Sequence, residues 1–199
     1  YVYYVGALAL NNLKQIKFST KKELKYKLGV DLNFPTLLAT LHPETVNIKT
    51  NKKLVKEFVK AILKSNKQVI ITLPNNDTNN KEMQESLLDV CNKSNKVWAF
   101  DALGPNLYYS CMKYCYAVIG NSSSGIIEAA SFGKYAINIG DRQKGRDRGK
   151  NVIDVASTEK VITDIIKKID FMPKLNNYNI YGEGNTAEKI INVIKTIFW

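Results

Sequence analysis

The chain has 199 residues, of which 45% are hydrophobic and 24% charged, and its formal net charge is +11. This is the composition of an ordinary globular protein of one domain, and no apolar run approaches the roughly 18 residues that a membrane-spanning helix needs. The positive charge predicts an anionic partner such as nucleic acid, an acidic surface or a phosphorylated small molecule, or else reflects a Lys-rich composition that selects no partner.

The first predicted helix follows an apolar opening segment, Tyr1–Val5, which starts without Met and reads as a cut-out from a longer protein. Thr20 and Glu23 have the spacing of a capping box, so they predict the start of a short helix that Gly29 can close.

From Pro35 onward, apolar runs of strand length alternate with helical patterns. The predicted strands are 35–41, 68–73, 97–100, 116–120, 135–139 and 152–155. The predicted helices are 54–63, 81–92, 106–113, 125–132, 158–169, with Thr158 as a possible cap, and 186–198. Strands that are apolar throughout are buried on both faces, so this alternation predicts a parallel sheet between two layers of helices.

The expected fold is therefore an α/β, Rossmann-like doubly wound domain covering residues 1–199. Ligands of such sheets bind outside the carboxyl ends of the strands. This rule directs attention to the loops at 40–45, 74–77, 101–106, 120–125 and 140–149.

Cys91, Cys111 and Cys115 form an odd set without the spacing of a metal site. Cys111 and Cys115 lie one turn apart at a predicted helix, which favours buried or half-buried thiols over redox or metal roles. Free thiols fit a reducing cytoplasm. We expect no metal.

The segment Gly120-Asn-Ser-Ser-Ser-Gly-Ile-Ile-Glu128 joins a predicted strand to a predicted helix. Small residues, free backbone amides and three hydroxyls at a helix start can cradle a phosphate. The spacing matches neither the dinucleotide glycine pattern nor the P-loop. The alternative is a simple serine cap. Glu128 either favours the helix start electrostatically or accepts hydrogen bonds from sugar hydroxyls.

The loop 140–149 contains Arg142, Arg146 and Arg148 among three glycines. Their planar forks can bind a pyrophosphate, or the loop can be merely solvated. His42, the single histidine, directly follows a predicted buried strand. Its place at a strand end favours a role in acid–base chemistry or phosphate contact over a structural one.

In residues 116–152, the stretch AVIGNSSSGIIEAASFGKYAINIGDRQKGRDRGKNV resembles the signature region of hydrolysing UDP-N-acetylglucosamine 2-epimerases. YYVGALALNNL (3–13), LHPET (41–45), LPNNDTNNKEM (73–83) and YGEGNTAEKI (181–190) are similar to further segments of that family in the same order. The resemblance implies the C-terminal half of a GT-B enzyme, with residues 1–15 as the hinge from a missing N-terminal half and residues 186–199 as the C-terminal helix.

The resemblance also implies roles for individual residues. Ser122 and Ser123 would bind the diphosphate, Glu128 the ribose hydroxyls, and Arg142 the nucleotide. The backbone near Leu103 and the ring of Tyr108 would meet the uracil. Asn75 matches a ligand contact, and His42 matches the family's histidine in the cleft, as the catalytic residue. The implied reaction eliminates UDP to give a 2-acetamidoglucal and then adds water to give N-acetylmannosamine, with no metal or redox cofactor.

Two departures from the non-hydrolysing bacterial enzymes favour the hydrolysing branch. Asn121 stands where those enzymes have an aspartate before a Ser-Gly-Gly run, and Arg142-Gln-Lys-Gly-Arg146 replaces a Thr-Glu-Arg-Pro-Glu loop. The implied partners are a UDP-sugar and the N-terminal half, in a homo-oligomeric full-length enzyme.

Three alternatives stay open at this point. Close relatives act on UDP-2,4-diacetamido-trideoxyhexose, and GT-B glycosyltransferases bind nucleotide sugars in a similar way. The third alternative is a basic module that binds nucleic acid, but no base-reading motif is visible, so we expect no nucleic-acid partner. Because no apolar run is long enough to span a bilayer, we expect no membrane partner either.

Overall fold

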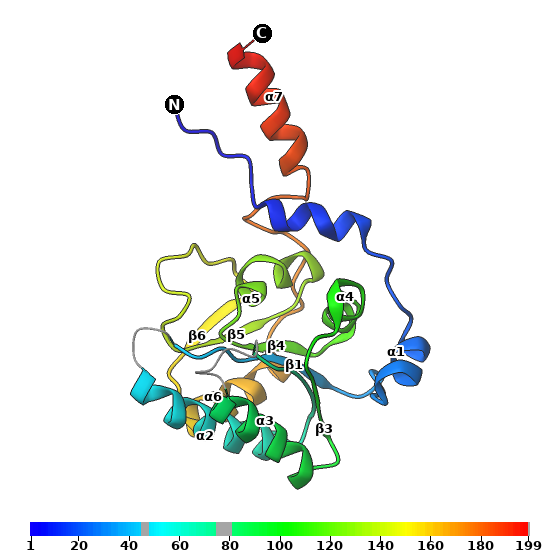
Figure 1. Ribbon diagram of the computed structural model, residues 1–199, viewed down its shortest axis with the longest axis vertical. Helices are drawn as coiled ribbons and strands as arrows, with labels where there is room; N and C mark the ends of the chain where they lie inside the picture. The colour runs from blue at the N-terminus through cyan, green and yellow to red at the C-terminus, as the bar shows by residue number, and fades with distance from the viewer. Residues whose placement is uncertain (45–47, 75–80, 199) are drawn as a thin grey trace.

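The fold is built on one six-stranded sheet in which every neighbouring pair of strands is parallel, in the order β3-β2-β1-β4-β5-β6. A computed structural model describes residues 1–44, 48–74 and 81–198 (Figure 1). The strands are β1 (Thr36–Thr40), β2 (Gln68–Thr72), β3 (Val97–Phe100), β4 (Ala117–Gly120), β5 (Ala136–Ile139) and β6 (Val152–Val155). This arrangement confirms the predicted Rossmann-like fold class.

Helices cover both faces of the sheet (Figure 1). One layer contains α2 (Ile48–Lys64), α3 (Lys81–Lys93) and α6 (Glu159–Lys168), in which α2 contacts both of the others. The other layer contains α1 (Lys21–Leu28), α4 (Gly104–Tyr114), α5 (Ser123–Ile127) and the 3-10 helix η3 (Ala129–Phe132). Two further 3-10 helices, η1 (Leu8–Gln15) and η4 (Ile169–Phe171), and the helix α7 (Thr186–Phe198) complete the described elements.

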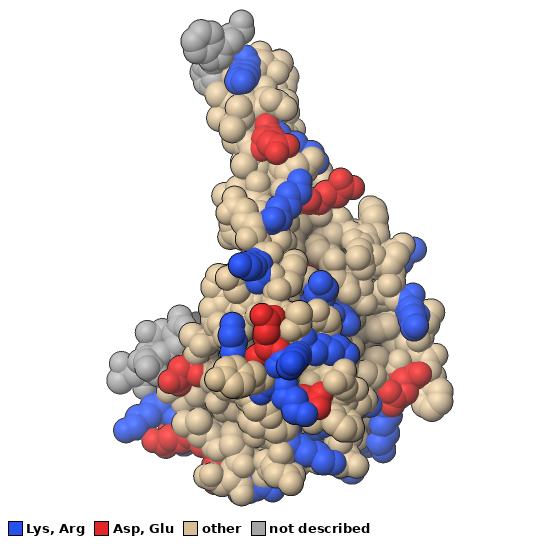
Figure 2. All heavy atoms as spheres, turned by 90° about the vertical axis from the view of Figure 1, so that its right-hand side faces the viewer, with Lys and Arg blue, Asp and Glu red and all other residues tan. Residues whose placement is uncertain are grey.

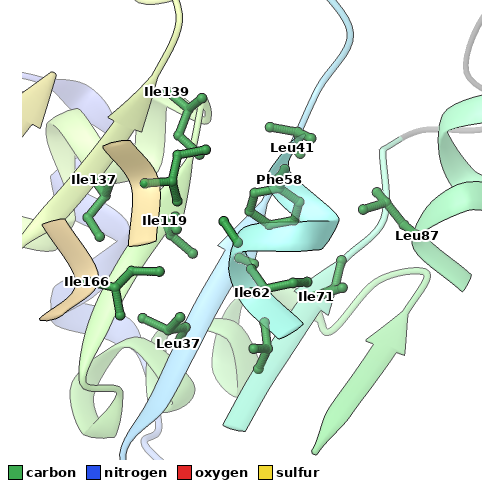
Figure 3. Packing of buried hydrophobic residues seen from close by; sticks show 14 of the residues in the cluster. Leu37, Leu41, Phe58, Ile62, Ile71, Leu87, Ile119, Ile137, Ile139 and Ile166 are labelled. Carbon is green, nitrogen blue, oxygen red and sulfur yellow. The ribbon is translucent and has the colours of Figure 1, made fainter. Parts of the chain in front are cut away.

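Two apolar cores lie on opposite faces of the sheet because successive strand residues point to opposite sides. Leu37 and Ile119 join Phe58 of α2 and Ile166 of α6 in one core, as Figure 3 shows. Their strand neighbours Leu38 and Val118 lie in the second core, under α1 and α4. The buried thiols of Cys111 and Cys115 belong to this second core, as predicted, and burial raises the pKa of each to about 12.

The helix cap predicted at Thr20 forms, whereas the one predicted at Thr158 does not. Thr20 and Glu23 form the capping box of α1, and Gly29 closes that helix with a positive φ of 72°. At α6, Thr158 occupies the cap position but its side chain makes no capping bond. The carboxylate of Glu57 accepts a hydrogen bond from the backbone N of Glu159 at 3.0 Å instead. A residue from the neighbouring helix therefore replaces the predicted cap.

The helix predicted at 125–132 is wrong as a single element. It starts two residues earlier, after Ser122, and it breaks at Glu128 into α5 and the tighter η3. The side-chain amide of Asn179 donates to the carbonyl of Ile127 at 2.6 Å and to Ser131 Oγ at 2.8 Å. Asn179 thus satisfies a carbonyl at the end of α5, where the chain continues as a 3-10 turn.

The first fifteen residues hold the start of α7. The sequence predicted no helix there, but η1 forms, and Asn11 Oδ1 accepts hydrogen bonds from the backbone N of Thr186 and of Ala187 at 3.0 and 3.4 Å. From this anchor α7 extends away from the sheet beside the N-terminal segment (Figure 1). Within the described ranges, no helix combines the length and apolar character needed to cross a membrane.

Candidate functional site

The candidate site lies where the order of the strands reverses. From β1 the chain proceeds through β2 to β3 on one side, and from β4 through β5 to β6 on the other. The loops after β1 and β4 therefore leave the sheet in different directions, which opens a crevice at their carboxyl ends. His42 follows β1, and the serine-rich turn 121–124 follows β4.

Gly120 allows these two loops to approach closely. Its φ is +132°, and a Cβ at this position would lie 2.0 Å from the carbonyl oxygen of Thr40. The next residue, Asn121, is fully buried, and its side chain forms two hydrogen bonds with the backbone of His42. Glycine is thus required for the backbone contact, and asparagine joins the loop after β1 to the loop after β4.

The three serines of the turn have different hydrogen bonds. Ser122 is the cap of α5, and its Oγ accepts from Ser124 N at 3.4 Å and from Ser124 Oγ at 3.1 Å. A hydroxyl carries one proton, so Ser122 retains that proton for another acceptor. The half-buried Ser123 makes no side-chain hydrogen bond with any described residue. The turn therefore combines a serine cap with two hydroxyls that can donate to a ligand.

Glu128 is buried at the end of α5, with 7% of its surface exposed. Its Oε1 accepts a hydrogen bond from the hydroxyl of Tyr109 at 3.2 Å. Its Oε2 is buried and has no partner among the described residues. Burial raises the pKa of Glu128. An unpaired buried carboxylate oxygen costs free energy, so Glu128 is a destabilising group in the chain without ligand.

Tyr108 and Leu103 come from α4 and its start. The hydroxyl of Tyr108 forms a 2.6 Å hydrogen bond with Ser124 Oγ, and burial raises the pKa of Tyr108. Its ring meets that of Tyr109 edge to face. Leu103 is buried at the residue before α4. The structure thus brings Tyr108 next to the serine turn by its hydroxyl, which the sequence did not predict.

His42 and Arg142 both form hydrogen bonds with Asn121, His42 through its backbone and Arg142 through its side chain. Arg142 is exposed, and its Nη1 donates to the carbonyl oxygen of Asn121 at 3.1 Å. Burial lowers the pKa of His42, and the charge of Arg142 lowers it further. An imidazole in this environment is neutral at pH 7, so it can accept a proton.

The other two arginines of loop 140–149 have different surroundings. Arg148 donates to Asp154, to Gln143 O and to Arg146 O, so it stabilises its own loop. Arg146 is exposed. The arginines are therefore not one cluster of equivalent forks. On the face shown in Figure 2, Lys and Arg side chains have Asp and Glu among them.

Three contributors to this site escaped the sequence analysis as site residues. Tyr109 bonds to Glu128, Asn121 joins the loops, and the buried Gln143 donates from Nε2 to Asn121 O at 2.8 Å. Their sequence signal is weak because each role depends on which loops meet. Asn75 lies outside the described residues. A hollow of about 800 Å³ lies elsewhere, between α2 and α3, and only Pro43 of its lining belongs to a loop of the site.

Comparisons with known proteins point to one family of 2-epimerases. A model of the UDP-N-acetylglucosamine 2-epimerase family matches residues 1–195. The GDP/UDP-N,N'-diacetylbacillosamine 2-epimerase (hydrolyzing) of Campylobacter jejuni is 43% identical over 155 residues, which are 77% of this chain and 40% of that protein. The UDP-N,N'-diacetylbacillosamine 2-epimerase (hydrolyzing) of Legionella pneumophila is 33% identical over 98% of this chain and 52% of that protein. The chain spans about half the length of the curated relatives it matches.

Solved structures agree on the fold. The UDP-GlcNAc 2-epimerase of Neisseria meningitidis, solved with UDP-GlcNAc bound, superposes with a TM-score of 0.74 at 18% identity. The match covers 96% of this chain and 54% of that structure. At this identity the likeness concerns the fold.

Proposed function

Because the chain belongs to the UDP-N-acetylglucosamine 2-epimerase family, we propose that it carries the UDP-binding half of a hydrolysing UDP-sugar 2-epimerase. The full reaction converts UDP-N-acetylglucosamine and water into N-acetylmannosamine and UDP. It proceeds by elimination of UDP to a 2-acetamidoglucal, followed by addition of water to the double bond. Such a product feeds amino-sugar biosynthesis of the sialic acid type in the cytoplasm.

The observation that carries this proposal is the buried Glu128 with its unpartnered Oε2, at the opposite end of α5 from the serine turn. A nucleoside diphosphate offers phosphate oxygens that need donors and a ribose that offers two hydroxyl donors. Ser122 and Ser123 have hydroxyl protons for the diphosphate, and we assign the buried carboxylate of Glu128 as the acceptor of the ribose hydroxyls. Hydroxyl donors at one end of α5 and a carboxylate acceptor at the other support this assignment.

The remaining residues complete the assignment. Arg142 supplies positive charge beside the serine turn, and the neutral His42 faces the reacting end of the substrate as the catalytic residue. The start of α4 at Leu103 and the ring of Tyr108 border the uracil, with Asn75 as a further ligand contact. No metal or redox cofactor takes part in this scheme.

A second sugar is supported by the relatives. The two curated relatives described above are named as epimerases of N,N'-diacetylbacillosamine, which is a 2,4-diacetamido-trideoxyhexose. UDP-2,4-diacetamido-trideoxyhexose is therefore our alternative substrate. Both substrates carry UDP and a 2-acetamido group at the carbon that is epimerised, so the same UDP-binding half serves either of them.

The proposed partner of this half is a second Rossmann-like domain of the same enzyme. The relatives are about twice as long as the chain, and one wall of a crevice does not enclose a nucleotide sugar. The exposed apolar side chains of α7, Ile191, Ile194 and Ile197, offer a surface for that domain. We place the full-length enzyme among homo-oligomers.

Ser123→Ala and Arg142→Lys test the anion site. If Ser123 donates to the diphosphate, its loss costs about 1.5–3 kcal/mol of UDP affinity and leaves the melting temperature unchanged. Arg142→Lys keeps the charge but loses the planar fork, so it weakens UDP more than uridine. Ser86→Ala, on the exposed side of α3, is the control. Intact UDP affinity in both site variants would remove the phosphate site from the proposal.

A further inference from the structure

Asn121 connects three loops of the site through one buried residue. Its side-chain Oδ1 accepts from the backbone N of His42 at 2.7 Å, and its Nδ2 donates to the backbone O of His42 at 2.8 Å. Its own backbone N donates to Thr40 O at 3.1 Å. Its carbonyl oxygen accepts from Arg142 Nη1 at 3.1 Å and from Gln143 Nε2 at 2.8 Å. The loops after β1, β4 and β5 therefore meet at this residue.

The two bonds to His42 require an amide side chain. The backbone N of His42 is a donor and its O is an acceptor, so the partner must accept with one atom and donate with the other. A carboxylate of the same shape accepts but cannot donate, and an aliphatic side chain does neither. Since Asn121 is fully buried, an unmet bond here is not replaced by solvent.

We propose that Asn121 is a positioning residue that holds His42 and Arg142 at fixed places beside the serine turn. It touches neither nucleotide nor sugar in this scheme and acts through the backbone of the histidine and the fork of the arginine. The inference rests on the proposed function, because that function is what gives His42 and Arg142 their roles. Asn121 is the residue that connects His42 and Arg142.

The single histidine of the chain makes this proposal directly measurable. His42 is the only histidine among the 199 residues, so the imidazole Cε1–H resonance in an NMR spectrum belongs to it alone. Burial and the charge of Arg142 hold the pKa of the His42 imidazole below its usual value. Among the described residues, the charge that acts on the His42 imidazole is that of Arg142, and Glu44, two residues further along the loop, accepts at Oε1 from the backbone N of Asp141. A displaced His42 loop changes this environment and moves the titration midpoint.

The experiment compares Asn121→Ala and Asn121→Asp with Asn151→Ala. Asn151 is also a buried asparagine, and its side chain also makes two hydrogen bonds, to Gly125 O and Lys134 O, but it contacts neither His42 nor Arg142. Thermal unfolding, the His42 titration without ligand, and UDP affinity are measured for each. All three variants should lose stability, since each leaves buried groups unpaired.

Only the two Asn121 variants should change the titration midpoint of His42. We expect the His42 midpoint to rise in both, and to rise more with Asp because a carboxylate favours the imidazolium. UDP affinity should fall about ten-fold in both, while Asn151→Ala keeps the wild-type midpoint and affinity. If Asn121→Ala does not fold, Asn121→Asp, which keeps the bond from the His42 amide, gives the result.

A variant at Asn121 that melts lower but keeps the wild-type His42 midpoint and UDP affinity would overturn the positioning role. Failure of the proposed function would look different. In that case the wild-type chain would not bind UDP at all, whereas the ligand-free histidine titration would still decide whether Asn121 positions His42.

Discussion

At the scale of single residues, Glu128 couples binding to stability. Its pKa is raised by burial, so the folded state disfavours the charged form. A group whose folded pKa lies above its unfolded value contributes most stability in acid and loses it as the pH rises through the folded pKa. The chain without ligand therefore bears a cost at Glu128 at neutral pH that ribose hydroxyls would relieve.

Glu128→Gln should accordingly stabilise the ligand-free chain at pH 7–8 by about 1 kcal/mol while weakening UDP binding. The stability difference from wild type should shrink as the pH is lowered towards 4.5. Urea unfolding between pH 4 and 8, with calorimetry for UDP, measures both effects. Glu85→Gln, at an exposed carboxylate of α3, should change neither. A stability gain at Glu128 that is independent of pH would contradict the charge argument.

The hydroxyl and the aromatic ring of Tyr108 can be tested separately. Its hydroxyl bonds to Ser124, which in turn bonds to the cap Ser122. Tyr108→Phe removes the hydroxyl that bonds to Ser124, so it should lower the unfolding free energy by about 1 kcal/mol. It should also weaken the binding of UDP, because the hydrogen bonds that link Tyr108, Ser124 and Ser122 beside the proposed diphosphate site are interrupted. The binding of uridine should not change, because the aromatic ring stays. Tyr108→Leu should weaken uridine as well. If uridine binds equally to wild type and the Leu variant, Tyr108 does not meet the base.

The sequence predicted which loops come together at the carboxyl edge of the sheet better than it predicted how side chains pair within them. His42, Ser122 and Arg142 could be proposed from the sequence because each lies at a strand end in a recognisable segment, and the structure brings their loops together. The hydrogen bonds of Asn121 and Tyr109 could not be predicted. The bond between Asn121 and His42 joins residues 79 apart and depends on how closely β1 and β4 approach, and the bond between Tyr109 and Glu128 depends on how α4 packs beside α5. Nor could the sequence distinguish Ser122, which caps α5, from Ser123, which does not.

At the scale of elements, periodicity predicted every strand, and β3 and β6 at their observed bounds. Buried parallel strands are apolar throughout, which makes their signal strong. The helices deviated where tertiary contacts decide. Asn179 bonds to the end of α5, and Glu57 takes the place of Thr158 at the start of α6. Such partners lie far away in sequence, so local patterns do not reveal them.

The start of α7 offers a test of one such contact. Asn11 accepts from two backbone amides of that helix, as a cap residue would. Asn11→Ala should cost about 1 kcal/mol and speed hydrogen exchange in the first turn of α7. Asn12→Ala, at the exposed neighbour, should leave exchange unchanged. Equal exchange rates in both variants would show that η1 does not hold α7.

At the scale of the whole molecule, we propose that the site is one wall of a crevice that a second domain completes. His42 has no carboxylate partner among the contacts described for it, and an elimination followed by hydration needs more than one proton transfer. We therefore expect the 199-residue chain to release no UDP from UDP-N-acetylglucosamine above a no-protein control. Release at a rate proportional to protein concentration would mean that the catalytic groups are divided differently between the two halves.

Calorimetric titration of the 199-residue chain with UDP, uridine and ADP tests the central claim most directly. Serine hydroxyls and Arg142 should make UDP bind more tightly than uridine, and the contacts to uracil should make it bind more tightly than ADP. The affinity for UDP should be weak, because the crevice is open on one side. We therefore expect UDP to bind more tightly than both uridine and ADP. ADP binding as tightly as UDP, or no heat with UDP at all, would contradict it.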